Sequence, residues 1–344
     1  MNSMMNAIVF SEVGEFEYTQ RPVPEVTRED DVQIKILAAS ICGTDVHILK
    51  NPPGIVANKG IILGHECVGE VVETGADVIA LKPGDLVILD NNVPCGVCAA
   101  CQTGNSNLCN RMASMGVHTD GVFTQYAVAP ERQMVRIPED IPLKQAIFAE
   151  PLNCVMGAVK KLKVMPGDTA VVLGGGPIGL YFTTLMKACG AGQVIVSEVS
   201  DFRAEYARAQ GADVIVNPKE QSLEEEVRKL TEGNGADIVI DAVGVLINDA
   251  IRAVKNGGSI LLFGQNAAAR QEICQNDITG RGLTVYGNYI GNYTLKNVAK
   301  LLVGGQVDFS GMITHELPLK NFADGLKAMQ EGKALEVILY PFED

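Results

Sequence analysis

Three side chains able to bind a metal lie close together in the N-terminal part of the sequence. Cys42 opens the block Cys42-Gly43-Thr44-Asp45-Val46-His47, and His65 and Glu66 follow in Gly64-His65-Glu66. One thiolate, one imidazole and one carboxylate form a ligand set that zinc accepts while a coordination position stays open for water or substrate. Taken singly, each has a simpler interpretation, as a small buried side chain, a hydrogen-bonded core residue or a surface charge. Their combination favours a catalytic metal site.

Four further cysteines indicate a second metal site. Their spacing, Cys95-x2-Cys98-x2-Cys101-x7-Cys109, places four sulfur ligands in one short segment. Four thiolates complete a tetrahedral shell without leaving a position for substrate, so sites of this kind are structural. The alternative is a surface loop with four free thiols, which the tight clustering argues against. We therefore predict two zinc ions per chain, one catalytic and one structural.

A glycine-rich loop has the pattern G-x-G-x-x-G of dinucleotide-binding proteins. It is Gly174-Gly175-Gly176-Pro177-Ile178-Gly179, directly after the apolar run Thr169–Leu173 and directly before a predicted helix. Gly174 permits a tight turn, Gly176 allows the backbone to approach a pyrophosphate, and Gly179 lets helix and strand pack closely. The whole loop, with Pro177 and Ile178, is a candidate cofactor site. A turn of this composition in an α/β domain without nucleotide is the alternative.

Two charged residues after this loop bear on which dinucleotide it binds. Glu198 stands at the end of the next predicted strand, nineteen residues beyond Gly179. A carboxylate there accepts hydrogen bonds from the ribose 2′-hydroxyl and repels a 2′-phosphate, which favours NAD over NADP. Arg203, five residues further on, partly offsets this repulsion. The sequence therefore predicts NAD and leaves NADP open.

Together these motifs resemble the medium-chain zinc-containing alcohol dehydrogenases. The stretch from Gly64 to Val78 is similar to that family's zinc signature, and the other motifs occur in the family's order over nearly the whole chain. The resemblance implies an enzyme that transfers hydride from an alcohol to NAD. It also implies a GroES-like N-terminal domain, a partly open β-barrel that the C-terminal segment completes, with the active site in a cleft between domains.

The resemblance assigns the ligands of the catalytic zinc. Cys42, His65 and Glu66 would hold the metal. Glu150, in Ala149-Glu150-Pro151-Leu152, occupies the position of a glutamate in sorbitol and threonine dehydrogenases and of a cysteine ligand in ethanol dehydrogenases. It would be a fourth ligand or exchange with zinc-bound water. The alternative for Glu150 is a carboxylate at the start of a helix.

The resemblance also assigns three residues of the Cys42 block to supporting roles. Asp45 would accept a hydrogen bond from the far ring nitrogen of His65 and fix the orientation of that ring. Thr44 would contact the substrate hydroxyl. His47 would end a proton relay from Thr44, through the cofactor ribose, to water.

Two classes of predicted elements position these motifs. Up to about residue 150, turns and short alternating runs such as Asp31–Leu37 and Val68–Val72 are typical of an irregular β domain. From Thr169, apolar strands alternate with helices such as Asp201–Gln210 and Ser222–Thr231, which predicts an α/β, doubly wound Rossmann domain with a six-stranded parallel sheet. We expect residues 1–150 and 287–344 to form the catalytic zinc-binding domain and residues 151–286 the NAD-binding domain. The predicted strands are Thr169–Leu173, Gln193–Glu198, Asp213–Val216, Asp237–Asp241, Ser259–Phe263, Leu283–Tyr286 and, after two helical stretches, Leu335–Leu339.

Composition limits the partners of the chain. Its 344 residues are 47% hydrophobic and 20% charged, enough apolar material for two cores. A net charge of -13 repels nucleic acid and anionic membranes, and no apolar run has the length of a membrane span. The odd count of nine cysteines and the lack of a secretory signal in Met1–Phe10 predict a cytoplasmic protein without a disulfide framework. Family resemblance implies a homodimer or homotetramer, and Met4 and Met5 leave the start of translation open.

The substrate is the least determined feature. Glu150 places the chain nearer to polyol and threonine dehydrogenases than to ethanol dehydrogenases. However, Ile48 replaces an aromatic residue of sorbitol dehydrogenases, Asn288 replaces their arginine, and Leu49–Pro53 lacks the aromatic-acidic block of threonine dehydrogenases. We predict reversible, zinc-dependent oxidation of a secondary alcohol of a polyol or sugar alcohol to the ketone, with L-threonine or another small secondary alcohol or diol as the alternative. The intact ligand residues argue against a zinc-free quinone or enoyl reductase and against a non-catalytic NAD-binding module.

Overall fold

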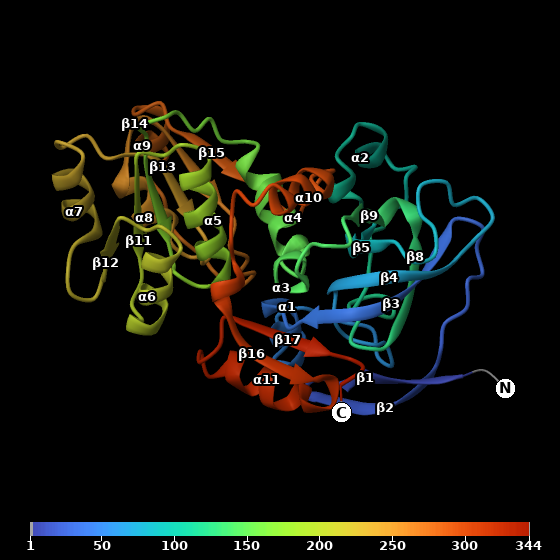
Figure 1. The fold of residues 1–344 in the computed structure, drawn as a ribbon. Helices are drawn as coiled ribbons and strands as arrows, with labels where there is room; N and C mark the ends of the chain where they lie inside the picture. Colours follow the sequence, from blue (N-terminus) through green and yellow to red (C-terminus); the bar gives the residue numbers. More distant parts are fainter. Residues whose placement is uncertain (1–2, 344) are drawn as a thin grey trace. The chain divides into compact units, whose positions relative to one another are not determined.

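The computed structural model describes residues 3–343, and the chain divides into two compact units (Figure 1). The first unit contains the residues up to Asn153 together with those from Asn292 onward, and the second comprises Cys154–Gly291. The outer limits of the predicted catalytic domain, residues 1 and 344, lie outside the described residues. Each unit has its own main sheet and hydrophobic core.

The second unit is built on six parallel strands. Their order is β12-β11-β10-β13-β14-β15, so the chain starts in the middle, extends the sheet to one edge and then fills the other half. This is the strand order of the Rossmann fold, and the predicted six-stranded doubly wound sheet is confirmed. The strands are short and rich in β-branched residues because both faces of a parallel sheet are buried. They are β10 (Thr169–Leu173), β11 (Gln193–Ser197), β12 (Val214–Val216), β13 (Ala236–Asp241), β14 (Val254–Leu262) and β15 (Thr284–Gly287).

Helices connect successive strands of the second unit and pack on its sheet (Figure 1). The first of them begins at Pro177, within the glycine-rich segment and earlier than the prediction of a helix after Gly179. Pro177 lacks an N–H, but the first residue of a helix has no intrahelical acceptor for that group. In a later helix, Leu223 and Val227 lie one turn apart and are both buried in the core of the sheet. The helices are α5 (Pro177–Ala188), α6 (Asp201–Ala209), α7 (Leu223–Leu230), α8 (Ile247–Ala253) and α9 (Gln275–Thr279).

The main sheet of the first unit combines strands from both ends of the chain. Its order is β16-β17-β3-β4-β5-β9, and β8 pairs with β3. The strand β17 lies between β16 and β3, so a C-terminal strand occupies an interior position beside the N-terminal strands. The predicted N-terminal β domain, joined by the C-terminal segment, is confirmed. The strands are β3 (Asp31–Ser40), β4 (Glu66–Thr74), β5 (Leu86–Leu89), β8 (Tyr126–Pro130), β9 (Met134–Ile137), β16 (Ile313–Pro318) and β17 (Glu336–Tyr340).

Two small sheets and several short helices complete the first unit. The hairpin β1–β2 and the pair β6–β7 are separate from the main sheet. The four remaining strands are β1 (Met4–Glu12), β2 (Glu15–Pro22), β6 (Asn92–Val93) and β7 (Ala113–Ser114). The helices are α1 (Gly43–Leu49), α2 (Ala99–Gln102), α3 (Leu143–Ala146), α10 (Leu295–Val303), α11 (Phe322–Gln330) and α4 (Ala149–Val159), which continues into the second unit. Four 3-10 turns are η1 (Ser106–Leu108), η2 (Glu131–Gln133), η3 (Ser310–Met312) and η4 (Leu319–Asn321).

The core of the first unit joins the two ends of the chain. Phe322, at the start of α11, is fully buried, and its ring centroid lies 4.8 Å from that of Phe16 and 5.2 Å from that of Phe123. Truncation of a buried Phe to Ala costs about 3–5 kcal/mol of stability. The C-terminal segment is therefore an integral part of the unit that carries the candidate metal ligands.

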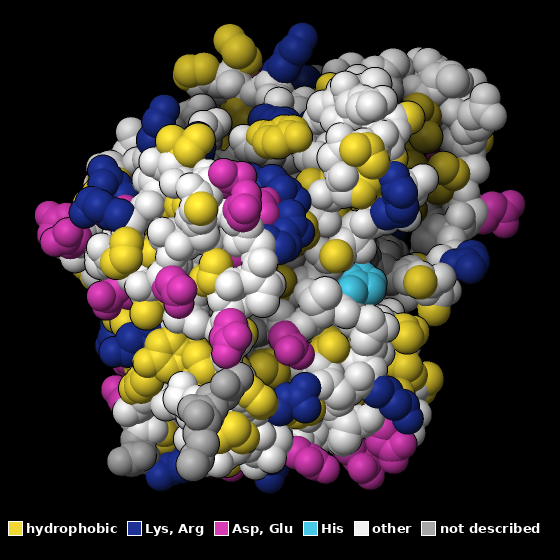
Figure 2. Space-filling model, turned by 90° about the vertical axis from the view of Figure 1, so that its right-hand side faces the viewer, with side chains coloured by type: hydrophobic (Ala, Val, Ile, Leu, Met, Phe, Trp, Pro, Cys, Tyr) yellow, Lys and Arg dark blue, Asp and Glu magenta, His cyan; other side chains and the backbone are white. Residues whose placement is uncertain are grey.

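Charged side chains of both signs are interspersed on the surface shown in Figure 2. Acidic side chains alternate there with Lys and Arg instead of forming a patch of one sign, although the chain as a whole carries a net charge of -13. Among the described residues, no helix combines the length and apolar character needed to cross a membrane.

Candidate active site

The structure brings Cys42, His65 and Glu66 together in the first unit. One ligand atom of each lies within 4.8 Å of the others. Glu66 is the first residue of β4 and pairs with Ser40, the last residue of β3. Cys42 follows two residues after Ser40 and caps the N-terminus of α1. The two ligand segments are distant in sequence but are adjacent because the ends of two antiparallel strands meet here.

A glycine cluster sets the direction in which the chain enters His65. Gly64 has φ +85°, and a Cβ atom there would lie 2.3 Å from the ring of Phe123. Gly116 and Gly121 pack against the backbone of Gly64, where Cβ atoms would lie 2.3 and 2.0 Å from its carbonyl oxygen. Any side chain at these positions would displace the turn and, with it, the imidazole of His65.

Asp45 links two of the candidate ligands. Its Oδ2 accepts a hydrogen bond from the backbone N–H of Cys42 at 2.9 Å, and its Oδ1 lies 3.7 Å from Nδ1 of His65. The second distance exceeds a hydrogen bond, and both atoms are buried without a hydrogen-bond partner among the described residues. Buried polar atoms of this kind need a partner. A histidine that binds a metal with one ring nitrogen usually donates its other ring N–H to a carboxylate, so the facing Asp45 fits a metal-binding role for His65.

Negative groups crowd around Cys42. Burial, and then the negative charges of Asp45 and Glu150, raise the pKa of Cys42 to about 12. Burial also raises the pKa of Glu66, helped by the charges of Cys42 and Glu336. Groups that repel one another in a buried site are stabilised by a divalent cation. The sulfur, nitrogen and oxygen donors therefore fit zinc in their chemistry and in their charge.

Glu150 lies near these ligands but is not part of the group defined by the 4.8 Å limit. It is buried in the first turn of α4, and its charge acts on Cys42, His65 and Glu66. Its position in the first turn of α4 agrees with the alternative that Glu150 is only a carboxylate at the start of a helix. Its electrostatic interaction with the three candidate ligands agrees with a role at the metal. Direct ligation by Glu150 stays a prediction.

Ser40 and Glu336 adjoin the site and escaped the sequence interpretation. The hydroxyl of Ser40 donates a hydrogen bond to Oε1 of Glu336, and both residues are buried. Ser40 pairs with Glu66 on one side and with Ile338 on the other, so the side chains of Glu66 and Glu336 lie on the same face of the sheet. No local motif marks Glu336. The one signal in the sequence is that Glu336 is a charged residue within the otherwise apolar predicted strand Leu335–Leu339.

The helix α1 carries the two residues predicted to move the proton. Thr44 is half-buried and His47, one turn further on, is exposed to solvent. The loop after the helix returns onto His47: the N–H of Gly54 donates to the His47 carbonyl at 2.9 Å, and a Cβ at Gly54 would lie 3.0 Å from Nδ1 of the ring. An exposed histidine can exchange protons with water, as the predicted relay requires.

The four remaining candidate ligands converge in the segment between β6 and β7. The Sγ atoms of Cys95, Cys98, Cys101 and Cys109 all lie within 4.8 Å of one another. The backbone N–H of Val97 holds the pKa of Cys95 down to about 6, and the backbone N–H of Cys101 lowers that of Cys98. Backbone donors aimed at sulfur stabilise the thiolates of Cys95 and Cys98, the form that binds metal, whereas burial and the neighbouring Cys98 raise the pKa of Cys101 to about 12. We call residues 95–109 the four-cysteine lobe.

In the second unit, the glycine-rich loop joins β10 to α5 in a tight turn. Gly174 has φ +96°, and Gly176 is the N-cap of α5. A Cβ atom at Gly179 would lie 1.8 Å from the carbonyl oxygen of Gly174, so only glycine fits there. The free N–H groups at the start of a twelve-residue helix provide a binding site for a phosphate group.

Glu198 is held at the edge of this loop by three backbone donors. Gly175 donates to Oε2 at 2.7 Å, and Val199 and Ser200 donate to Oε1 at 2.7 and 2.8 Å. The carboxylate is therefore fixed next to the glycine-rich turn. Arg203 follows on α6, and its guanidinium would lie 3.9 Å from a Cβ at Gly176.

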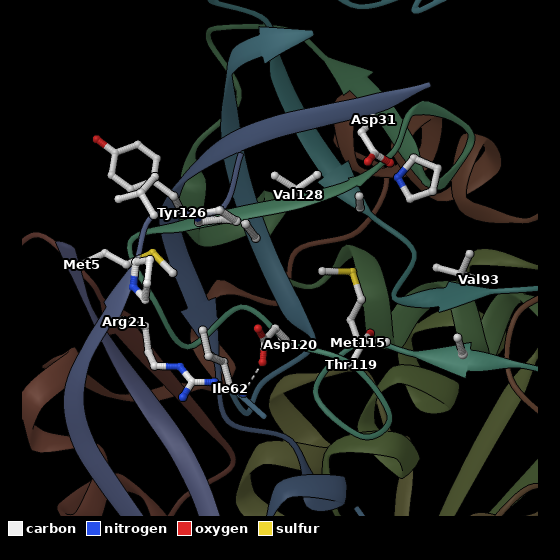
Figure 3. A pocket seen from close by; sticks show the side chains of 18 of the residues that line it. Met5, Arg21, Asp31, Ile62, Val93, Met115, Thr119, Asp120, Tyr126 and Val128 are labelled. Atoms are coloured by element: carbon white, nitrogen blue, oxygen red, sulfur yellow. Dashed lines mark hydrogen bonds between the residues drawn. The ribbon is translucent and has the colours of Figure 1, made fainter. Parts of the chain in front are cut away.

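A pocket elsewhere in the first unit is separate from the ligand cluster (Figure 3). Its volume is about 680 Å³, and Met5, Met115 and Tyr126 are among its lining residues. The side chain of Asp120 in its wall accepts the backbone N–H of Ile62 at 2.9 Å. None of the candidate ligands lines this pocket.

Comparisons with known proteins agree with this arrangement. Two family models match, an alcohol dehydrogenase GroES-like domain over residues 28–139 and a zinc-binding dehydrogenase over residues 177–304. An L-threonine 3-dehydrogenase from Caldanaerobacter subterraneus subsp. tengcongensis is 33% identical, with 99% of this chain and 100% of the relative covered. A sorbitol dehydrogenase from Bacillus subtilis is 31% identical over 98% and 97% of the two chains. A solved structure from Sinorhizobium meliloti 1021, described as a zinc-binding dehydrogenase bound to NADP, is 31% identical with a TM-score of 0.93 and covers 98% and 100%.

The two domains and the comparisons define a zinc-binding dehydrogenase. The chain belongs to the medium-chain zinc-containing alcohol dehydrogenase family, as its motifs predicted. It is an oxidoreductase that acts on CH–OH groups with zinc and a nicotinamide cofactor.

Proposed function

We propose that this enzyme oxidises a secondary alcohol of a polyol or sugar alcohol to the ketone, reversibly and with NAD. The observation that carries the proposal is the convergence of Cys42, His65 and Glu66 within 4.8 Å. The buried carboxylate of Glu150 beside this group supports a polyol over ethanol, because ethanol-type members have a cysteine at that position. The similarity to a sorbitol dehydrogenase supports the same substrate class.

In this proposal the residues of the first unit hold the metal and move the proton. Zinc, when bound, supplies Lewis-acid polarisation of the alcohol oxygen, and the nicotinamide accepts the hydride. Cys42, His65 and Glu66 are the metal ligands, and Asp45 orients the backbone of Cys42 and the ring of His65. Thr44 would contact the substrate hydroxyl and pass on its own hydroxyl proton as it accepts the proton of the substrate, and the relay would continue through the cofactor ribose to the exposed His47, which releases a proton to water.

We infer a second, structural zinc in the four-cysteine lobe and NAD as the preferred dinucleotide. The backbone-held carboxylate of Glu198 would face the adenosine ribose and repel a 2′-phosphate. The S. meliloti relative is bound to NADP, so the two cofactors are to be compared directly. Glu198→Ala should raise kcat/KM for NADP relative to NAD, and an unchanged ratio would argue against this role.

We further propose a cytoplasmic homodimer or homotetramer. None of the nine cysteines forms a disulfide, and a reducing compartment keeps cysteines in this state. Within the second unit, β15 is an edge strand of the sheet and offers unpaired backbone groups to a second copy. Light scattering coupled to size-exclusion chromatography tests this point, and a monomer at micromolar concentration would contradict it.

L-threonine, or another small secondary alcohol or diol, is the second candidate substrate. Several relatives, at 33–35% identity, are L-threonine 3-dehydrogenases. A panel of sorbitol, xylitol, 2,3-butanediol, L-threonine and ethanol, assayed with NAD and NADP separately, distinguishes the candidates. The highest kcat/KM on sorbitol or xylitol supports the proposal, and the highest value on 2,3-butanediol, L-threonine or ethanol overturns it.

The metal assignment is tested by Cys42→Ser in the zinc-loaded protein. We expect one of two zinc ions to be lost and turnover to disappear, while NADH binding is retained. Cys189→Ser is the matched control, because Cys189 is an exposed cysteine of the second unit. Dehydrogenase activity comparable to the unmodified protein in Cys42→Ser would refute the assignment.

A further inference from the structure

A single asparagine side chain fastens the four-cysteine lobe to the C-terminal part of the first unit. Nδ2 of Asn292 donates to the carbonyl of Gly104 at 2.8 Å, and the hydroxyl of Ser106 donates to Oδ1 of Asn292 at 3.0 Å. Both contacts fall between Cys101 and Cys109, the third and fourth ligands of the lobe. Asn292 therefore fixes the chain segment that joins Cys101 to Cys109 and determines how far apart their two sulfur atoms lie.

Two residues later the same segment is bonded to the helix α4. Thr294 is 2% exposed, and its hydroxyl donates to Oδ1 of Asn153 at 2.7 Å, with the Asn153 carbonyl oxygen 3.0 Å away. Between the two contacts, Tyr293 has φ +55°, a left-handed conformation that a non-glycine residue adopts only when its surroundings hold it there. The short link from the lobe to α4 is thus well defined.

The segment that leads into the lobe at its N-terminal end is also hydrogen-bonded to Asn153, through Asp90. Nδ2 of Asn153 donates to Oδ2 of Asp90 at 3.0 Å, and Oδ1 of Asp90 accepts the backbone N–H of Asn92 at 3.0 Å. Asn92 opens β6, which leads directly into Cys95. Asn153 is therefore linked to the segment that leads into the lobe through Asp90, and to Thr294, which lies two residues after the Asn292 that holds the middle of the lobe.

Asn153 lies one helical turn after Glu150, on the same side of α4. We propose that Asp90, Asn153, Asn292 and Thr294 form a brace through which the metal-filled four-cysteine lobe positions Glu150 beside the Cys42 cluster. The inference rests on the two zinc sites proposed above. It gives the lobe a role in catalysis beyond local stability and makes Asn292 and Thr294 positioning residues, since neither is a candidate ligand.

The brace engages both side-chain polar groups of each of its two asparagines. In Asn153 the side-chain oxygen and nitrogen are both engaged, by Thr294 and Asp90. In Asn292 both are engaged by the lobe. The side-chain amides of both asparagines therefore stabilise the fold, and we expect other residues to contact the substrate.

The first arm of the test measures metal release from the zinc-loaded enzyme with the chelator 4-(2-pyridylazo)resorcinol. Asn292→Ala should release the lobe metal about tenfold faster and weaken zinc binding at the Cys42 site. Asn105→Ala is the matched control, because the side chain of Asn105 is hydrogen-bonded to Thr103 within the lobe. Release of both metals from Asn292→Ala at the rate of the unmodified protein would overturn the proposal.

The second arm uses the hydroxyl of Thr294. Thr294→Val removes it at nearly constant shape and should lower kcat about tenfold with an unchanged KM for NAD, whereas Thr294→Ser should restore kcat. The loss in Thr294→Val should disappear in a Glu150→Gln background if the brace acts through Glu150. A loss of the same size in both backgrounds would reduce the brace to a structural contact and refute the proposal.

The two arms separate this inference from the proposed function. If the protein oxidises no alcohol, the metal-release arm still tests the brace. If release and kcat are unaffected by the variants while polyols are oxidised, the brace is refuted and the proposed function stands.

Discussion

Replacement of Gly179 by alanine tests the assignment of the glycine-rich loop as the cofactor site. A Cβ atom at this position would lie 1.8 Å from the carbonyl oxygen of Gly174, where about 3.0 Å is the closest approach that real structures tolerate. The start of α5 must therefore move by roughly 1 Å from the loop. The loop cannot follow freely, because Gly174 donates to Ser197 at 2.8 Å and Gly175 donates to Glu198 at 2.7 Å.

This displacement should weaken both folding and cofactor binding. Overpacking of a tight contact costs about 1–3 kcal/mol of stability. Loss of one hydrogen bond to a charged pyrophosphate costs about 1.5–3 kcal/mol, so the Kd for NADH should rise by at least about tenfold. Fluorescence titration of NADH and urea unfolding measure the two effects.

Gly311→Ala is the control for Gly179→Ala. A Cβ atom at Gly311 meets nothing within 4 Å, so stability and NADH affinity should be unchanged. Gly179→Ala with the NADH affinity of the unmodified protein would refute the cofactor assignment, even if its stability falls. In that outcome the glycine serves only the packing of α5 on β10.

Three further substitutions test the first unit and one surface ion pair. Asp45→Ala should reduce the zinc affinity of the Cys42 site by about 10- to 100-fold in chelator competition, and an unchanged affinity would contradict the orienting role. His47→Ala should slow proton release and shift the pH profile of kcat with no loss of zinc, and an identical profile would exclude the relay. Burial alone would raise the pKa of Asp213, but Lys187 at 2.8 Å and the Val194 N–H lower it. A carboxyl whose pKa is lowered by folding stabilises the native state above its unfolded pKa and loses this contribution as pH falls through its folded pKa. Lys187→Ala should therefore cost less than about 1 kcal/mol at pH 7 and still less at about pH 3. Equal destabilisation at both pH values, in urea unfolding, would contradict the linkage.

Features encoded in short stretches could be predicted from the sequence. The strand β10, the glycine-rich loop and the start of α5 form one continuous pattern, and the structure has β10 at its predicted bounds. Both groups of candidate metal ligands follow from ligand chemistry and spacing, and the structure brings each group together. Local information suffices where neighbouring residues determine the geometry.

Features that depend on distant contacts could not be predicted. The strand β16 was missed because its side chains are only half-buried and show no clear alternation. The strand β14 starts at Val254, five residues before the predicted Ser259, because Lys255–Gly258 form an irregularity in the pairing with β13 that resembles a turn in sequence. The pairing of Ser40 with Glu336 and the brace at Asn153 join segments far apart in the chain. Such contacts leave no periodic signal.

The interior position of β17 bears on how the enzyme is synthesised. During translation β3 and β4 leave the ribosome long before Glu336–Tyr340, so one end of β3 stays without its neighbour until the polypeptide is nearly complete. The second unit is a continuous segment and can fold earlier, as domains do during synthesis. Since Cys42 and Glu66 adjoin that end of β3, we expect metal acquisition at this site to be a late event in the maturation of each newly made chain.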